Sequence, residues 1–222
     1  MTGSASQLLI PVENEVRELD AKLLLSCVAA ERGYPVLFGS RAFVHYKVAS
    51  APRGVYMAKS MRTLSDRMFA IMTQLGHEIV CFDEEALVRK PDAEYYRERV
   101  SSKALGLVSH LIAWGEDDAR VFRQHPDYSG TPVHIVGNPR IDMMRPEFRG
   151  YYEEERYKIS ERYGDFVLIN SNFGEFNHFV SHMSNALKMA KGEAVEGATD
   201  YLIARAKFRY CLLYTSDAAD EL

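Results

Sequence analysis

The sequence predicts an α/β protein whose first lobe is a Rossmann-like parallel sheet, followed by the start of a second α/β lobe. Two observations lead to this prediction. Short apolar runs alternate with amphipathic helical patterns, and a glycine ends the helical pattern just before the next apolar run at both Gly33 and Gly76. A strand, a helix and a strand in succession form a βαβ unit, in which the strands are parallel and the crossover is right-handed.

The first βαβ unit begins with an apolar strand at 8–12. Asn14 is the expected N-cap of the helix that follows. Apolar residues then recur at steps of three and four, which predicts one buried stripe on this helix; its members are Val16, Leu19, Leu23, Cys27 and Ala30. Gly33 stands where a helix C-terminal glycine is expected, and residues 35–38 read as the second strand.

The pattern continues with strands at 54–58 and 79–82. Thr63 is the expected cap of the helix between them, because Asp66 three residues later resembles a capping box. The predicted buried stripe of that helix is Leu64, Met68, Ile71 and Leu75. Residues 83–104 read as a loop and a polar helix. Further strands are expected at 107–114 and 133–136, separated by a helix over 115–124 that has three acids in its first turn, so six strands precede residue 140.

The first lobe is expected to cover 1–150, and the boundary to fall within 140–163. A charged helix at 151–163 and an apolar run at 166–169 predict the opening of a second α/β lobe over 151–210. The last residues, 211–222, begin CLLYTSDAADE, which resembles the translation of a sequencing-library adapter. We therefore expect a truncated chain that is inactive by itself; the alternative is a native polar tail.

Composition excludes several classes of function. The chain of 222 residues is 47% hydrophobic and 26% charged, which rules out general disorder and allows a sizeable core. Its net charge of −4 leaves no basic excess to coat a phosphate backbone, so no nucleic-acid partner is expected. The three cysteines (Cys27, Cys81 and Cys211) lie far apart, which predicts neither a metal site nor a disulfide framework and fits the cytoplasm. No cofactor is predicted, and no 18-residue apolar run is present.

Polar and charged residues follow the predicted strands, at the edge of the sheet where open α/β folds bind ligands. Glu13 is either a general base for an acceptor hydroxyl or a carboxylate that favours a helix start. Arg17 and Asp20 read as a surface pair one helical turn apart. Lys59, Ser60 and Arg62 form either an anion cradle or an ordinary loop.

Two more groups of candidates follow later strands. Asp83 and Glu84 are either bases with a raised pKa or part of a solvated acidic run. The last group, Gly137, Asn138, Arg140 and Asp142, follows the strand at 133–136; it reads either as a tight turn in which Asp142 caps the next segment or as a ligand-binding loop.

The chain resembles the bacterial surface carbohydrate biosynthesis protein family over about residues 7–185. The resemblance rests on an ordered series of short motifs: LIPVEN at 9–14, AKSM at 58–61, DEE at 83–85, AWGEDD at 113–118, GNPRID at 137–142 and NSNFG at 170–174. The GNPRID motif is also similar to the inter-lobe crossing of GT-B glycosyltransferases and of related epimerases and glycerophosphotransferases. No His-Gly dipeptide occurs here, which argues against glycerophosphate transfer.

The resemblance implies a GT-B fold and a role in making capsule or O-antigen glycans. It implies glycosyl transfer from a nucleotide-sugar donor to a glycan acceptor, without a bound metal, with Asn170 and Asn172 facing the cleft. It also implies a cytoplasmic enzyme that can associate peripherally with the inner membrane. A nucleotide-sugar 2-epimerase of the same fold and a non-catalytic scaffold for glycan assembly are the alternatives.

Overall fold

The computed structural model describes residues 6–85, 91–168, 188–189 and 191–193 of the chain. The chain divides into two units, Met1–Tyr157 and Lys158–Leu222. The candidate residues Asn170 and Asn172 lie outside the described residues, as does the tail at 211–222.

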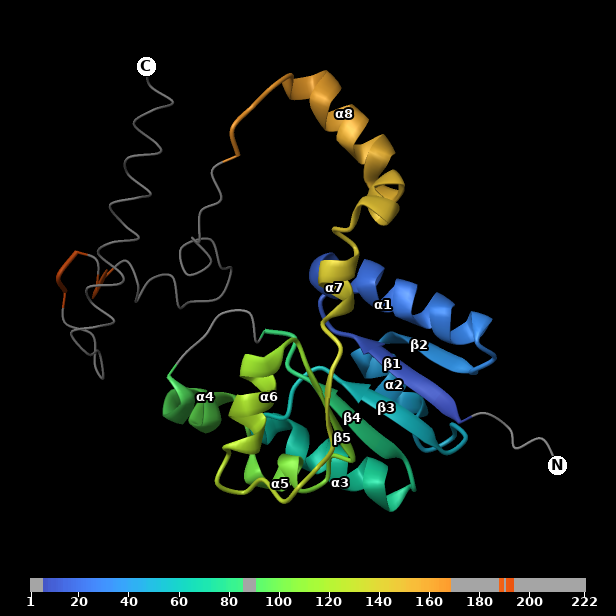
Figure 1. The fold of residues 1–222 in the computed structure, drawn as a ribbon, viewed down its shortest axis with the longest axis vertical. Coiled ribbons are helices and arrows are strands. Elements are labelled where there is room, and N and C mark those ends of the chain that lie inside the picture. Colours follow the sequence, from blue (N-terminus) through green and yellow to red (C-terminus); the bar gives the residue numbers. More distant parts are fainter. Residues whose placement is uncertain (1–5, 86–90, 169–187, 190, 194–222) are drawn as a thin grey trace. The chain divides into compact units, whose positions relative to one another are not determined.

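The first unit is a Rossmann-like α/β fold built on six parallel strands, which confirms the six predicted strands (Figure 1). The strands are β1 (Gln7–Val12), β2 (Val36–Ser40), β3 (Gly54–Ala58), β4 (Glu78–Phe82), β5 (His110–Ala113) and β6 (Val133–Ile135). Their order in the sheet is β2-β1-β3-β4-β5-β6. Strand β2 lies on one side of β1, and β3 to β6 follow in order on its other side. The direction in which successive strands are added therefore reverses between β1 and β3.

Helices alternate with these strands. They are α1 (Glu15–Glu31), α2 (Arg41–Lys47), α3 (Asp66–Gln74), α4 (Asp92–Arg99), α5 (Ser102–Leu105), α6 (Glu116–Arg123), α7 (Pro139–Asp142) and α8 (Glu153–Tyr163), with 3₁₀ turns η1 (Thr63–Ser65) and η2 (Pro146–Tyr152). Right-handed crossovers place α1 on one face of the sheet and α2, α3 and α6 on the other. The main hydrophobic core lies on that second face, where α2 to α6 contribute residues such as Val44, Phe69 and Phe122.

The helix α1 begins where the sequence predicts, because the Asn14 side chain accepts a hydrogen bond from the Arg17 N–H at 3.2 Å. The predicted buried stripe of α1 is wrong, however. Val16 is 96% exposed, and Leu23 and Cys27 are exposed too. The buried face instead carries Glu18, Ala21, Lys22, Ser26 and Ala29. Two of these side chains are charged, and they neutralise each other inside the protein.

The predicted cap of α3 is also wrong. Thr63 lies in the 3₁₀ turn η1, and α3 starts three residues later at Asp66 without a side-chain cap. This offset turns the helix, so Leu64 is 94% exposed while Phe69 and Met72 are buried. Met68 and Leu75 pack partly against the core.

The offset of α3 predicts very different costs for two substitutions. Leu64→Ala is expected to change the free energy of unfolding by less than about 0.5 kcal/mol, because the side chain is in water. Met72→Ala is expected to cost about 2–5 kcal/mol, because it opens a cavity in the core. Urea unfolding monitored by circular dichroism measures both. Equal costs for the two variants would contradict the observed burial of Met72 and exposure of Leu64.

The second unit contains the remainder of α8. The strand expected at 166–169 is not found over its described part: residues 166–168 form no strand, and Val167 and Leu168 are 89% and 76% exposed. An apolar run forms a strand only where a neighbouring strand pairs with it, and none of the described residues does so here. No described helix is long and apolar enough to cross a membrane.

Candidate functional site

The candidate residues of the first unit meet at the carboxyl edge of the sheet. Glu13 follows β1, Lys59 follows β3, Glu84 follows β4 and Arg140 follows β6. Parallel strands end at one edge, so residues far apart in sequence become neighbours there. A chain of ion pairs joins them, and it also includes Arg41, Glu18 and Lys22.

Glu18 is the buried centre of this network. Its side chain is only 2% exposed, and it accepts hydrogen bonds from the Lys22 ammonium at 2.8 Å, the Lys59 ammonium at 3.1 Å and the Glu13 N–H at 2.9 Å. Burial alone raises the pKa of Glu18, but the hydrogen bonds from Glu13 and Lys22 outweigh burial and lower that pKa to about 2. Glu18 is therefore ionised throughout the physiological range.

Glu13 lies between two cations at the rim. Its carboxylate contacts Lys59 at 2.6 Å and Arg41 at 3.0 Å. The Glu13 side chain is 36% exposed, against 4% for Asp83 and 11% for Glu84. Of the three predicted bases, Glu13 is therefore the one that a substrate hydroxyl reaches most readily.

Glu84 joins α1 to the loop after β6. Its carboxylate lies 3.7 Å from the Lys22 ammonium and 3.6 Å from Arg140 Nε, and its carbonyl accepts a hydrogen bond from Arg140. The Arg140 guanidinium also lies over the Trp114 ring, 5.5 Å from its centroid. Arg140 is thus held against the sheet edge by an acid, a carbonyl and an aromatic face.

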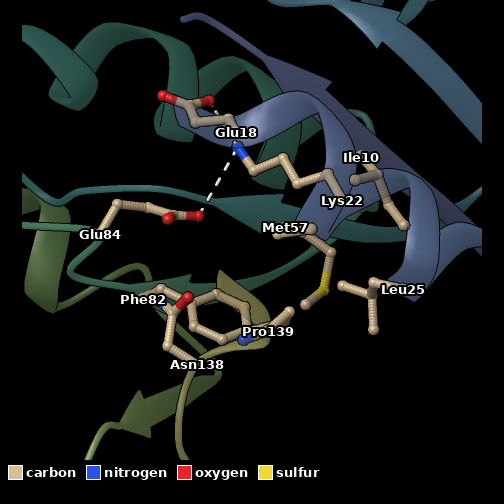
Figure 2. Close-up of a pocket in the computed structure, with 10 residues that line it drawn as sticks. Ile10, Glu18, Lys22, Leu25, Met57, Phe82, Glu84, Asn138 and Pro139 are labelled. Carbon is tan, nitrogen blue, oxygen red and sulfur yellow. Dashed lines mark hydrogen bonds and ion pairs between the residues drawn. The ribbon is translucent and has the colours of Figure 1, made fainter. Parts of the chain in front are cut away.

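A small pocket lies beside Glu84 at the point where the strand order reverses. It is lined by Ile10 of β1, Met57 of β3, Phe82 of β4, Lys22 and Leu25 of α1, Asn138 and their neighbours. Figure 2 shows the Lys22 ammonium between the carboxylates of Glu18 and Glu84. The cavity volume is about 10 Å³, room for about one water molecule, so a larger ligand would lie outside it, against its polar rim.

Asn138 supplies an unused donor to this pocket. Its Oδ1 accepts a hydrogen bond from the Arg140 N–H at 2.9 Å, which caps α7. Its Nδ2 is buried and has no hydrogen-bond partner among the described residues. A buried donor without a partner costs about 1–3 kcal/mol, so such atoms mark places where a water or ligand acceptor fits.

Asp83 belongs to a separate network with Glu85 and three arginines. Its carboxylate accepts hydrogen bonds from Arg99 and from the Tyr95 hydroxyl, the latter at 2.8 Å. Burial raises the pKa of Asp83 to about 6, against the opposing effect of the hydrogen bonds from Tyr95 and the Glu85 N–H. Asp83 is therefore ionised at neutral pH, but its side chain is almost completely buried and a substrate hydroxyl cannot reach it, which makes it a poor base.

The other predicted residues lie near these networks without joining them. Ser60 accepts a hydrogen bond at its carbonyl from Ser65. Gly137 has a φ of 83°, which glycine tolerates and which turns the chain from β6 into α7. Asp142 pairs with Arg145 at 3.6 Å instead of capping the next segment.

Sequence reasoning missed several residues of these networks. The predicted pair of Arg17 and Asp20 does not form: Arg17 contacts Glu85, and Asp20 accepts hydrogen bonds from the Tyr151 and Tyr152 hydroxyls. Glu18 and Lys22 were not predicted, although their spacing of four residues on a helix that starts at the binding edge is a usable signal. No group of three or more metal-ligating side chains occurs among the described residues.

Comparison with protein-family models, with curated proteins and with solved structures found no significant match. The family resemblance of the short motifs therefore stays a prediction.

Proposed function

We propose that this chain serves surface carbohydrate biosynthesis by taking part in glycosyl transfer from a nucleotide-sugar donor. In this proposal its first unit is the N-terminal lobe of a GT-B fold. One observation supports it above the others: Glu13, Lys59, Glu84 and Arg140 converge at the carboxyl edge of a parallel sheet, where the strand order reverses. The order of the short motifs points to the same class of enzyme.

Each side chain has a distinct role in the proposed reaction. Glu13 accepts the proton of the acceptor hydroxyl. The oxygen of that hydroxyl bonds to the anomeric carbon of the donor sugar while the bond from this carbon to the diphosphate breaks. Lys59 and Arg140 stabilise the negative charge of the departing diphosphate. Asn138 Nδ2 offers a hydrogen bond to a water molecule that links it to a sugar or phosphate oxygen at the rim of the pocket. Asp83 and Glu84 position the cations instead of acting as bases.

A binding experiment tests this proposal. The chain is titrated calorimetrically with UDP-, GDP- and CMP-sugars, and at least one is expected to bind. Arg140→Gln is expected to weaken that binding about tenfold, equivalent to about 1.4 kcal/mol, because one charge-assisted contact is lost. Arg53→Gln, which removes an arginine before β3 at the opposite edge of the sheet, is the control and is expected to leave binding unchanged.

Two outcomes would contradict the proposal. One is the absence of binding to every sugar nucleotide at millimolar concentration; the other is undiminished binding in a folded Arg140→Gln variant. Product analysis separates transfer from the related epimerase reaction. Conversion of the sugar nucleotide without any acceptor would indicate epimerisation.

A further inference from the structure

Three arginines from different parts of the chain converge on the single carboxylate of Glu85. Arg62 Nη2 lies 3.1 Å and Arg17 Nη1 lies 3.6 Å from that carboxylate, and Arg99 donates a hydrogen bond to it. Arg17 belongs to α1, Arg62 follows β3 and Arg99 ends α4. We call these four residues the Glu85 cluster. It lies at the same carboxyl edge as Glu13 and Glu84 but shares no ion pair with their network among the described residues.

The Glu85 cluster carries more positive than negative charge. Even with Asp83, which pairs with Arg99, three guanidinium groups face two carboxylates. The side chains of Arg17, Arg62 and Glu85 are 47%, 42% and 41% exposed, so a molecule from solvent can reach them. Arg62 Nε is buried and has no hydrogen-bond partner among the described residues, which leaves donor capacity unused.

Stability alone explains this arrangement poorly. Exposed ion pairs contribute about 0–1 kcal/mol each, and bringing three like charges to one carboxylate adds mutual repulsion. A phosphoryl group matches the cluster better than a carboxylate does. It carries up to two charges and three oxygens, and guanidinium groups bind such oxygens in pairs of parallel hydrogen bonds.

We propose that Arg17, Arg62 and Arg99 form a phosphate-binding site that the Glu85 carboxylate occupies while no ligand is bound. This inference rests on the proposed function in expecting the phosphate to be part of the sugar-nucleotide substrate. Glu85 then acts as an internal competitor: the ligand displaces it, and the arginines exchange one carboxylate for a phosphoryl group. Asp83 keeps Arg99 in position from its buried side during the exchange.

The test is a calorimetric titration of the full chain with pyrophosphate, with inorganic phosphate and with UDP at constant ionic strength. Pyrophosphate is expected to bind. Glu85→Gln is expected to bind it about tenfold more tightly, because the competing carboxylate is gone, and Arg17→Gln and Arg62→Gln about tenfold more weakly. Comparison of the three ligands shows whether the site takes a free anion or the diphosphate of a nucleotide.

Matched controls lie at the opposite edge of the sheet. Glu78→Gln, at the start of β4, makes the same change in net charge as Glu85→Gln, and Arg53→Gln makes the same change as Arg62→Gln. Both are expected to leave pyrophosphate affinity within a factor of two. If Glu78→Gln gains as much pyrophosphate affinity as Glu85→Gln, the gain comes from the change in net charge alone, and the proposal is overturned.

The failure of this inference differs from the failure of the proposed function. Unchanged pyrophosphate affinity in Glu85→Gln overturns the phosphate site, whether or not Arg140→Gln weakens sugar-nucleotide binding. A gain of pyrophosphate affinity in Glu85→Gln supports the phosphate site even where no sugar nucleotide binds. In that case the proposed function is wrong and the phosphate site is supported.

Discussion

Replacing Glu18 with glutamine is expected to lower the free energy of unfolding at pH 7 by about 3 kcal/mol, because a buried ion pair loses one partner. The Lys22 ammonium is buried with Glu18 and donates hydrogen bonds to its carboxylate at 2.8 Å and to the Pro11 carbonyl at 2.7 Å. In Glu18→Gln that ammonium keeps the carbonyl and the more distant Glu84 carboxylate. Its charge is then poorly compensated in a region that is almost entirely shielded from solvent.

The pH dependence distinguishes this electrostatic cost from simple loss of packing. The pKa of Glu18 is about 2 in the folded chain and near 4.5 otherwise, so its ionisation stabilises the fold above pH 4.5. That contribution is lost as the pH falls from about 4.5 to 2. Glu18→Gln has no such group, so the stability difference between the two proteins should shrink over that window. Urea unfolding at a series of pH values measures it.

Asp83 changes stability in the opposite direction. Its pKa is raised from 3.8 to about 6 in the folded chain, so the folded state binds more protons between these values. Its penalty is present above pH 6 and disappears as the pH falls towards 4. Both proteins contain Asp83, so this effect cancels in their difference and leaves the Glu18 contribution visible.

Glu15→Gln is the matched control, because Glu15 is exposed in the first turn of the same helix. Its replacement is expected to change stability by less than about 0.5 kcal/mol. If Glu18→Gln costs no more than Glu15→Gln, or if its cost stays constant down to pH 2, the buried network does not stabilise the fold as described.

The sheet could be predicted from the sequence because its strands are marked locally. Each strand is a short apolar run, and glycines with positive φ at Gly33 and Gly76 end the helices before β2 and β4. These signals depend on nearest neighbours in the chain. The carboxyl edge followed from the parallel topology, so the meeting of Glu13, Lys59 and Arg140 was predicted as well.

The buried face of α1 could not be predicted in the same way. Apolar periodicity assumes that charged residues face water, whereas Glu18 and Lys22 are buried because each neutralises the other. The cations that complete the network, Lys59 and Arg140, come from distant parts of the sequence. A helical pattern contains no information about such partners.

The acidic run after β4 shows the same limit. Asp83, Glu84 and Glu85 are three consecutive acidic residues, yet each has a different environment. Asp83 is buried against Arg99, Glu84 pairs with Lys22 and Arg140, and Glu85 is exposed among the arginines of its cluster. The sequence alternatives of a base or a solvated run were both too simple, because Asp83 and Glu84 are both buried but face different cations, whereas Glu85 is exposed.

Gly54→Ala is expected to destabilise the first unit by about 3 kcal/mol, because the added methyl group meets a backbone and not a movable side chain. A Cβ at Gly54 would lie 2.0 Å from the Gln7 carbonyl oxygen. Gln7 and Gly54 are directly paired in the ladder between β1 and β3, so neither strand can move away without breaking that ladder. The Gly54 N–H also donates to His77 Nδ1 at 3.2 Å, and a shift of β3 would weaken that bond.

The effect of Gly54→Ala should reach the candidate site, because β1 and β3 run from the substituted position to Glu13 and Lys59 at the carboxyl edge of the sheet. Gly106→Ala is the control: its φ is −67° and the nearest atom to a new Cβ is at 3.5 Å, so alanine fits and is expected to be neutral or slightly stabilising. Urea unfolding gives both free energies, and amide hydrogen exchange of Leu9, whose N–H faces β3, reports on the ladder itself, whereas the Leu8 N–H donates to Pro35 beside β2. Equal stability of the two variants would show that β1 and β3 are not held in the register on which the carboxyl-edge site depends.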